Sequence, residues 1–282
     1  MKTHARLRVA CGCAQLVLGI ASLGAAGQKV VVGAAVAPEQ RQPIDQVDHR
    51  EWTRLLQSYV DGQGRVDYAA WKKNSVDQRA LDAYLKTLSR ADRGQEVSRQ
   101  AKLAYWINAY NAVTVKGILR EYPTDSIRQH TAKLFGYNIW HDLLLVVGDE
   151  KISLHAIEHE VLRKSGDFRI HFAIVCASNS CPRLLNEAYT PARVERQLEN
   201  NTRAFFRDKQ NFDCQQETFH LSSIFKWFAE DFGSTPAEQL RNIAKYLPDR
   251  EAQRLASEGR GKMVYLPYDW GLNDQATARR AK

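Results

Sequence analysis

Two cysteines that lie five residues apart are the most chemically suggestive feature of the sequence. Cys176 follows an apolar run and Cys181 precedes a proline, within the segment RIHFAIVCASNSCPRLL at positions 169–185. The apolar run predicts a buried strand, and the end of a strand is a typical place for a side chain to emerge at a site. Cys181 is expected at the mouth of a short helix, whose dipole lowers the pKa of a thiol. A disulfide between the two cysteines, a catalytic thiol and inert packing remain open.

The segment SLHAIEHEVLRK at positions 153–164 supplies possible partners for a thiol. With Ser153 as N-cap it predicts a helix, and Glu158 falls in the middle of the apolar stripe of that helix. A carboxylate at such a position must be paired or hydrogen-bonded, or it keeps its proton. His159 lies one turn from His155 at the edge of the stripe.

Two further residues of the apolar run have alternative interpretations. Arg169 is near enough in sequence to serve as an ion-pair partner of Glu158. His171 would point to the opposite face of the strand from Cys176, roughly 16 Å away along an extended chain. The sequence therefore predicts a core histidine at position 171 that cannot act as the base for Cys176.

The letters HAIEH at positions 155–159 also fit the H-x-x-E-H pattern of inverted zinc proteases. A catalytic zinc site needs a third protein ligand, and no downstream motif identifies one. We therefore expect no metal and no other cofactor.

The stretch RQAKLAYWINAYNAVTVKGILR at positions 99–120 is the most strongly helical segment. Its charged residues fall on one narrow sector, which predicts a helix that is surrounded by protein on most sides. Asn108 and Asn111 would then be buried amides that need hydrogen-bond partners. Each amide either fastens a neighbouring loop or polarises a substrate.

The predicted elements around this helix indicate the fold class. HDLLLVVGDEKISL reads as a strand and a Gly-Asp turn, and MVYLPYDWGLN as a late strand and loop. Helices are predicted at about 191–207, in DHREWTRLLQSYV and in HLSSIFKWFAEDFG. Because helices precede, interrupt and follow the strands without regular alternation, the sequence predicts a single α+β domain.

Composition and the chain ends limit the class of protein. The chain has 282 residues, a formal charge of +8 and 44% hydrophobic residues, but no nucleic-acid motif, so we expect no nucleic-acid partner. Residues 1–26 resemble a signal peptide, with cleavage after Ala26 or as late as Ala37, which predicts a periplasmic or secreted protein. A flexible linker is expected at 27–47, the domain at 48–273 and a basic tail at 274–282. No other stretch is suited to span a bilayer, so stable membrane insertion is not expected after signal removal.

Six blocks of the sequence, in order, resemble the domain-of-unknown-function family 547. They are AYWINAYNAVTVKGIL, SLHAIEHEVLR, RIHFAIVCASNSCPRL, YTPARVERQLENNTRAFF, LSSIFKWFAEDFG and YDWGLN, across about residues 50–273. The resemblance implies a fold distantly similar to papain and transglutaminase-type thiol hydrolases, with a central buried helix packed on a mixed or antiparallel sheet. The positions that match the family pattern are Asn108, Asn111, Glu158, His159, Arg169, His171, Cys176 and Tyr189, and Cys181 fits its bacterial form.

The resulting hypothesis is an exported thiol hydrolase or acyl transferase that acts on an amide, peptide or thioester. Cys176 would attack a carbonyl after losing its proton to His159, with Glu158 orienting the imidazole and Asn108 assisting. The residues expected to contact the substrate are Asn111, Arg169, Tyr189, Cys181 and Trp270.

Two other functions remain open. The first is a noncatalytic binding domain, in which a Cys176–Cys181 bridge stabilises a recognition loop and Trp270, Tyr268 and Trp140 line an aromatic groove. The second is thiol-disulfide exchange, which ranks last because four residues separate the cysteines, where redox motifs have two.

Overall fold

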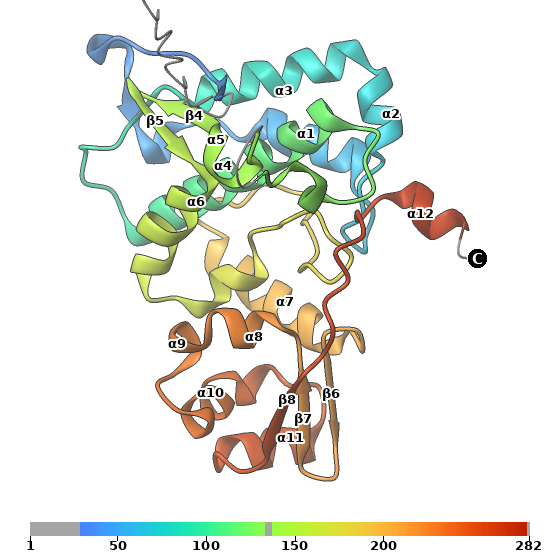
Figure 1. Ribbon diagram of the computed structural model, residues 1–282. Coiled ribbons are helices and arrows are strands. Elements are labelled where there is room, and N and C mark those ends of the chain that lie inside the picture. Colours follow the sequence, from blue (N-terminus) through green and yellow to red (C-terminus); the bar gives the residue numbers. More distant parts are fainter. Residues whose placement is uncertain (1–28, 133–136, 281–282) are drawn as a thin grey trace, which may run out of the picture.

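A long buried helix forms the centre of the larger of two lobes in the computed structural model, which describes residues 29–132 and 137–280 (Figure 1). This helix, α4 (Arg99–Glu121), begins after Ser98, whose hydroxyl accepts a hydrogen bond from the amide of Ala101. Nearly all of its apolar residues are buried, and Lys102 and Arg120 are exposed. The helix predicted at 99–120 is confirmed.

Three helices of the N-terminal half pack against one another, and the second and third of them also contact α4. They are α1 (Arg50–Tyr59), α2 (Tyr68–Lys73) and α3 (Ser75–Leu88). The aromatic rings of Trp52 and Tyr84 stack between α1 and α3 with centroids 5.6 Å apart. Large aromatic side chains of this kind bury much apolar area, so they fix these helices against the larger core.

A small mixed sheet lies at one edge of the larger lobe. Strands β4 (Leu143–Val147) and β5 (Glu150–Ser153) pair antiparallel around Gly148, which has φ 65° and therefore suits glycine. The predicted strand and Gly-Asp turn are confirmed, and the residues after the turn form a second strand, which was not expected. Strand β1 (Val30–Val32) pairs in parallel with β4 on its other side.

The segment predicted as a flexible linker, 27–47, therefore contributes to the fold from residue 30 onward. Besides β1 it contains β2 (Gln42–Pro43), which pairs in parallel with β3 (Ala91–Asp92), and 3-10 turns at Pro38–Gln40 and Ile44–Gln46. The polar composition of the segment does not predict this structure, because only a few of its residues, among them Ile44 and Val47, are buried.

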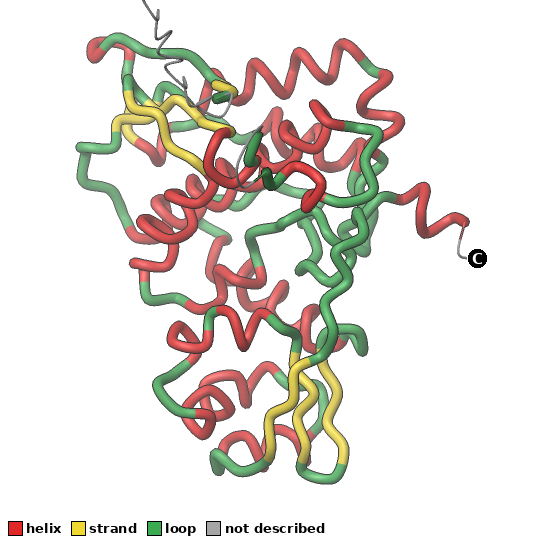
Figure 2. Tube along the Cα trace, in the orientation of Figure 1, coloured by secondary structure: helices red, strands yellow, loops and turns green. Residues whose placement is uncertain are grey.

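The smaller lobe, at the bottom of Figure 1, has a core of its own that is rich in phenylalanine. Its three strands are grouped in Figure 2, with β7 pairing antiparallel to β6 and parallel to β8. These are β6 (Phe212–Gln215), β7 (Thr218–Leu221) and β8 (Lys262–Tyr265). The helices are α7 (Val194–Arg207), α8 (Ile224–Trp227), α9 (Ala229–Phe232), α10 (Pro236–Ile243) and α11 (Arg250–Ser257).

One predicted helix of this lobe is divided. HLSSIFKWFAEDFG begins in β7 and continues as α8 and α9, with a break at Phe228, which has φ −119° and ψ 31°. The first residues of this segment pair with a neighbouring strand, so they are not helical. At the break, the ring of Phe228 stacks on His171 with centroids 4.2 Å apart. Helical periodicity does not reveal either of these long-range contacts.

The strand predicted in RIHFAIVC is wrong. Residues Phe168–Phe172 form a 3-10 helix, and irregular backbone follows as far as Cys176. The run is apolar on both faces because it passes between the two cores: Ile170 belongs to the larger core and Phe172 to the smaller. The mapping of residues to opposite faces of a strand therefore fails here.

The last part of the chain returns from β8 to the larger lobe and ends in α12 (Gln275–Arg280), within the predicted basic tail (Figure 1). Helices with small, mostly mixed sheets make this an α+β protein, as predicted. None of the helices in the described part of the chain is long and apolar enough to cross a membrane. The predicted signal peptide, residues 1–26, lies outside the described residues.

Candidate functional site

The thiol of Cys176 lies among three potential hydrogen-bond donors. Its sulfur is 2.9 Å from the sulfur of Cys181, 2.9 Å from the hydroxyl of Ser178 and 3.2 Å from the phenol of Tyr268. No disulfide joins the three cysteines that the structure describes, and the contact between the two sulfurs is longer than an S–S bond of about 2.05 Å. The environment is one that favours a thiolate.

Hydrogen bonding outweighs burial in setting the acidity of Cys176. Burial by itself raises the pKa of the thiol, but hydrogen bonds from Cys181, Ser178 and Tyr268 lower it to about 7. Burial raises the pKa values of both Cys181 and Tyr268 well above their usual ranges, so these two groups stay protonated and act as donors. A thiol with this acidity is substantially ionised at neutral pH.

The backbone around Cys176 is held in an unusual conformation. Ala177, which follows the cysteine, has φ 57°, a left-handed value that costs a non-glycine residue on the order of 1 kcal/mol. Asn111 of α4 holds the other side: its amide nitrogen donates to the carbonyl of Ala173, and its oxygen accepts from the amide of Val175. Asn111 thus satisfies backbone groups that a neighbouring strand would satisfy in a sheet.

The C-terminal segment completes this loop. The amide of Asn179 donates to the carbonyl of Gly271, and the amide of Asn273 donates to the carbonyl of Ala177. These backbone bonds fix the segment that contains Tyr268 and Trp270 beside the cysteines. The contact between Tyr268 and Cys176 follows from this pairing.

Cys176 opens onto a cavity of about 280 Å³ between the two lobes. Five of the predicted site residues line it: Glu158, His159, Cys176, Cys181 and Trp270. His171 lines it as well, so the prediction that this residue points away from Cys176 is wrong. The error follows from the mistaken strand, because a 3-10 helix does not alternate the faces of successive residues.

Glu158 lies on a π-helical turn, Ile157–Leu162, that continues α6 (Leu154–Ala156). The predicted cap is present, since the Ser153 hydroxyl accepts from the amide of Ala156. Burial raises the pKa of Glu158 to about 7, and its polar partner is Tyr110, whose phenol donates to Oε2 over 3.1 Å. The proposed pairing with Arg169 is absent among the described residues. The cavity therefore contains a carboxyl that is partly protonated at neutral pH.

His159 is connected to the smaller lobe through charged groups. A guanidinium nitrogen of Arg163 donates to its Nδ1 over 2.9 Å, so the ring hydrogen lies on Nε2. Arg163 also forms two bonds to Asp231, of 2.6 and 2.8 Å, and Nε2 of His171 lies 2.7 Å from the same carboxylate. Burial lowers the pKa of His159, and nearby positive groups lower it further. The imidazole is therefore a neutral hydrogen-bond donor at pH 7.

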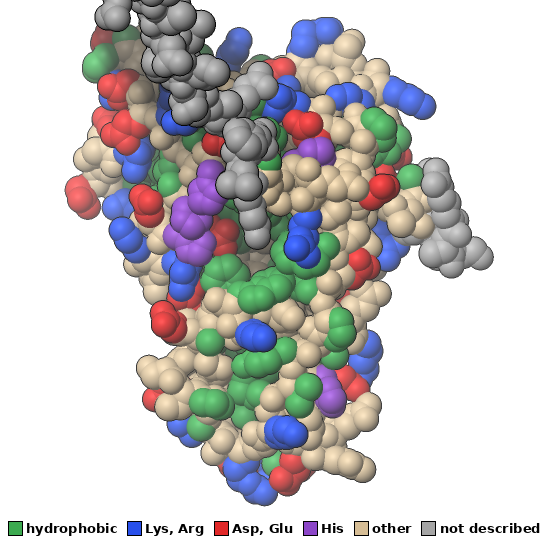
Figure 3. All heavy atoms as spheres, in the orientation of Figure 1, with side chains coloured by type: hydrophobic (Ala, Val, Ile, Leu, Met, Phe, Trp, Pro, Cys, Tyr) green, Lys and Arg blue, Asp and Glu red, His purple; other side chains and the backbone are tan. Residues whose placement is uncertain are grey.

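Histidines and aromatic rings form the walls of the cavity. The rings of His141, His155 and His159 lie in a row, tilted against one another, with centroids 4.6 and 4.3 Å apart. Figure 3 shows histidine side chains gathered beside an apolar surface between the lobes. Trp270 stacks on Trp227, which is 46% exposed. Among the described residues no group of three or more His, Cys, Asp or Glu is arranged to hold a metal ion.

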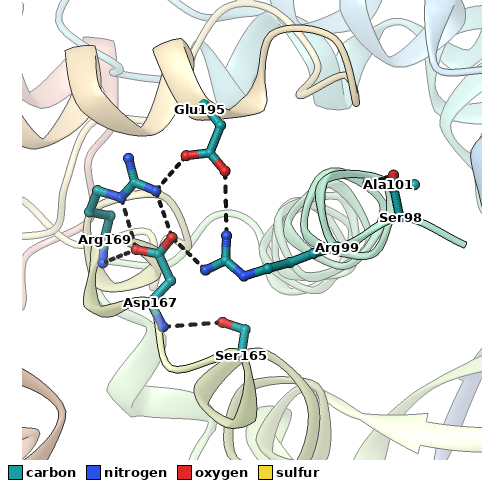
Figure 4. A network of polar contacts seen from close by, with 7 residues as sticks. All are labelled: Ser98, Arg99, Ala101, Ser165, Asp167, Arg169 and Glu195. Atoms are coloured by element: carbon teal, nitrogen blue, oxygen red, sulfur yellow. Dashed lines mark hydrogen bonds and ion pairs between the residues drawn. The ribbon is translucent and has the colours of Figure 1, made fainter.

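Four predicted site residues do not line this cavity. Asn111, predicted to contact the substrate, bonds only the backbone of the loop as described above. Asn108 bonds both the carbonyl and the amide of Tyr189, so its amide fastens a loop, and Tyr189 itself is fully buried. Arg169 bonds Asp167 and Glu195, and Arg99 of α4 joins the same network (Figure 4). These contacts are structural: they connect α4, α7 and the 3-10 helix at Phe168–Phe172.

Sequence reasoning missed three polar residues of the site. Ser178 and Asp231 belong to no recognisable motif, and the sequence around Arg163 indicates only that it is part of the helix that follows Ser153. The one local indication is for Ser178, which lies in a polar turn two residues after Cys176. Asp231 is 60 residues from His171, so their contact has no signature in a single sequence.

Comparison with known proteins finds one family model that matches the centre of the chain. Residues 94–206 match the family model described as "Protein of unknown function, DUF547". The predicted resemblance is confirmed over this stretch. It contains α4, the π-helical turn and both cysteines, whereas Tyr268, Trp270 and Asp231 lie beyond it. No curated protein and no solved structure matches the chain, so the likeness to papain and transglutaminase folds stays a prediction.

Proposed function

We propose that this protein is a thiol hydrolase or acyl transferase whose nucleophile is Cys176. The observation that carries the proposal is the triple hydrogen bonding of its sulfur, which lowers the pKa of the thiol to about 7 at the wall of a cavity. Reactive cysteines occupy such donor-rich, partly accessible places, whereas structural cysteines are inert. An ester, thioester or amide carbonyl is the electrophile that suits a thiolate.

Glu158 fits the role of general acid. The thiolate of Cys176 forms a bond to the carbonyl carbon, the carbonyl oxygen takes up negative charge, and the bond to the leaving group then breaks as Glu158 protonates that group. Water or another acceptor attacks the resulting thioester and releases the acyl group, with the Glu158 carboxylate taking the proton back. A carboxyl whose pKa burial raises to about 7 can perform both steps near neutral pH.

His159 fits the role of a hydrogen-bond donor in the same reaction. The sequence predicts a base at this position, but the contact from Arg163 occupies Nδ1 and leaves the hydrogen on Nε2. A neutral imidazole that donates stabilises a carbonyl oxygen as it gains charge. Among the described residues, neither His159 nor His171 hydrogen-bonds to the sulfur, and a thiol with this pKa needs no imidazole to ionise.

The walls of the cavity favour an apolar acyl group. Trp140, Phe228 and Trp270 line the space in front of Cys176. Rings of this kind bind apolar or planar groups by burying their surface. We therefore expect an acyl chain longer than acetyl to react faster.

Intact-mass measurement after mixing with p-nitrophenyl acetate and p-nitrophenyl hexanoate tests the proposal. We expect one acyl group per chain, faster labelling by the hexanoate, and loss of labelling in Cys176→Ser. Cys214→Ser is the matched control, since this half-buried cysteine of β6 lies outside the cavity and its burial raises its pKa. Labelling that survives Cys176→Ser, or that is absent from the wild-type protein, rejects Cys176 as the nucleophile.

A noncatalytic binding domain is the second candidate, and the exposed Trp227 favours it. This ring stacks on Trp270 and packs against Tyr268, with centroids 5.5 and 4.8 Å apart, and these contacts support an aromatic binding surface. Oxidation of the contacting thiols to a disulfide would consume the nucleophile and leave only this surface. An oxidised protein that binds an aromatic peptide as well as the reduced protein, with no acylation in either state, favours binding over catalysis.

Export is part of the proposal. The basic start and apolar run of residues 1–26 support secretion to the periplasm or beyond the cell. Fractionation of cells that express the full chain tests it, with the cleaved form expected outside the cytoplasm.

A further inference from the structure

A second cavity, of about 420 Å³, lies beside the cysteine loop. Cys181 and Pro182 line both this cavity and the one in front of Cys176, so the loop is a wall common to the two. The other walls come from the turn at 62–65 and from the segment 204–211 at the end of α7. The proposed reaction makes no use of this space.

Positive charge dominates the lining of the second cavity. Arg65, Arg183 and Arg207 line it, and none of them forms an ion pair with a described residue. Nε of Arg183 donates to the side-chain oxygen of Asn201 over 2.6 Å, a neutral partner that leaves the charge uncompensated. Asp208 is the one acidic residue in the described lining. Guanidinium groups so placed are suited to bind an oxyanion through charge-assisted hydrogen bonds.

One residue that lines the same cavity carries a buried acceptor without a hydrogen-bond partner. Asn211 is 3% exposed, and its side-chain oxygen has no hydrogen-bond partner among the described residues. Its backbone is fixed, because the amide donates to Asp208 and the carbonyl accepts from Ser222. A buried acceptor without a donor is costly, so a ligand hydroxyl that donates there would be favoured.

The segments that form the walls of this second cavity pack tightly against one another. Gly64 has φ 79°, and a Cβ added to it would lie 2.5 Å from Cβ and 2.6 Å from Cα of Arg183. The turn at 62–65 therefore packs directly against the backbone of the loop. Asn273 reinforces the contact from a third segment, donating to the carbonyl of Gly64 over 3.4 Å. A site that is already formed loses little entropy when a ligand binds.

We propose that this cavity binds the phosphate group of a phosphate monoester. The phosphate oxygens would accept hydrogen bonds from the three arginines, and a hydroxyl next to the phosphate group of the ligand would donate to Asn211. Inorganic phosphate keeps at least one proton at neutral pH and can donate it to the amide oxygen, whereas sulfate has nearly the same shape but no proton, so sulfate satisfies only the arginines. The site is independent of the chemistry at Cys176.

Isothermal titration of the folded, purified protein with glycerol 3-phosphate tests the proposal. Replacing two charged donors, in the double variant Arg65→Ala/Arg207→Ala, is expected to weaken binding by about tenfold or more. Arg196→Ala is the matched control, because Arg196 is an exposed arginine of the same helix, α7, that does not line the cavity. Equal affinity in the double variant and the wild type, or no binding at millimolar concentration, overturns the proposal.

Two further binding measurements identify the chemical class of the ligand. Sulfate should bind more weakly than inorganic phosphate to the wild type, and Asn211→Ala should remove that preference; equal affinities for the two ions in the wild type overturn the role of Asn211 as an acceptor. Co-sedimentation with phosphatidic acid vesicles separates a lipid headgroup from a soluble ester, since both present a phosphate monoester. Vesicle binding that the double variant loses identifies the lipid as the source. Because the titration does not depend on acylation, its result is independent of the proposed function.

Discussion

Tyr268 reaches the sulfur of Cys176 with its phenol oxygen at 3.2 Å, from 92 residues further along the chain. The same oxygen lies 3.1 Å from the hydroxyl of Ser178, so phenol, hydroxyl and thiol contact one another. The late segment of the chain thus provides one of the three donors that make Cys176 acidic. This relationship connects the family-matched centre of the chain to residues beyond it.

Removal of the phenol oxygen should make Cys176 less acidic. A hydrogen bond to a charged group contributes roughly 1.5–3 kcal/mol, and one pKa unit corresponds to about 1.4 kcal/mol. We therefore expect Tyr268→Phe to raise the midpoint of the pH dependence of Cys176 alkylation by iodoacetamide by about one unit, from near 7. Tyr265→Phe, in β8, is the control for loss of a tyrosine hydroxyl. An unchanged midpoint in Tyr268→Phe would show that the phenol does not stabilise the thiolate.

The acylation rate should have a narrow maximum near pH 7 with an amide substrate. The rate rises with pH as Cys176 loses its proton, because the thiolate is the nucleophile, and falls as Glu158 loses its proton, because the acid is then absent. A p-nitroanilide needs a protonated leaving group, whereas a p-nitrophenyl ester does not. Glu158→Gln should therefore slow anilide acylation by about 100-fold and abolish the alkaline decline, with little effect on the ester. Equal slowing of both substrates would exclude Glu158 as the acid.

His159→Ala should separate acylation from alkylation. Loss of one donor to a developing oxyanion slows acyl transfer by about 10²–10³-fold. Alkylation by iodoacetamide develops no oxyanion, so its rate at Cys176 should be nearly unchanged. His155→Ala removes the neighbouring exposed ring of the same row and serves as the control. Parallel loss of both rates in His159→Ala would instead support a base that ionises the thiol, as the sequence suggests.

The two amides of α4 should differ in their effect on Cys176. Asn111→Ala and Asn108→Ala each leave one backbone donor and one backbone acceptor without a partner, so each should lower the free energy of unfolding by roughly 2–4 kcal/mol. Only Asn111 holds the backbone next to Cys176, so only its replacement should also change the alkylation midpoint. Denaturant unfolding and alkylation kinetics measure the two effects. Equal alkylation midpoints in both variants would mean that the two hydrogen bonds from Asn111 to the backbone do not position the thiol.

Signal cleavage should occur after Ala26 rather than after Ala37. The later position would remove β1, which pairs with the buried strand β4 from Val30 to Val32. Without β1 the backbone groups along one edge of β4 lose their partners. Intact mass of the exported protein should therefore correspond to a chain that begins at Gly27. A mature form that begins after Ala37 would contradict the structural role of β1.

Local patterns in the sequence determined several elements and one electrostatic feature of the site. The periodicity of 99–120 predicts α4, and the apolar run before Gly148 predicts β4 and the turn after it, because helix faces and tight turns depend on residues that are close in sequence. The place of Glu158 within an apolar stripe was enough to predict a carboxyl that is either paired or protonated, and burial does raise its pKa. Cys176 stood out by its position after the apolar run.

Only the tertiary structure decided how these residues are arranged. The segment before Cys176 became a 3-10 helix because it passes between two cores and because Asn111 satisfies its backbone. The donors to the thiol and the Asp231–Arg163–His159 connection come from residues far apart in the chain. Hydrogen bonds of this range depend on where whole lobes pack, and a single sequence records the residue types but not their juxtaposition.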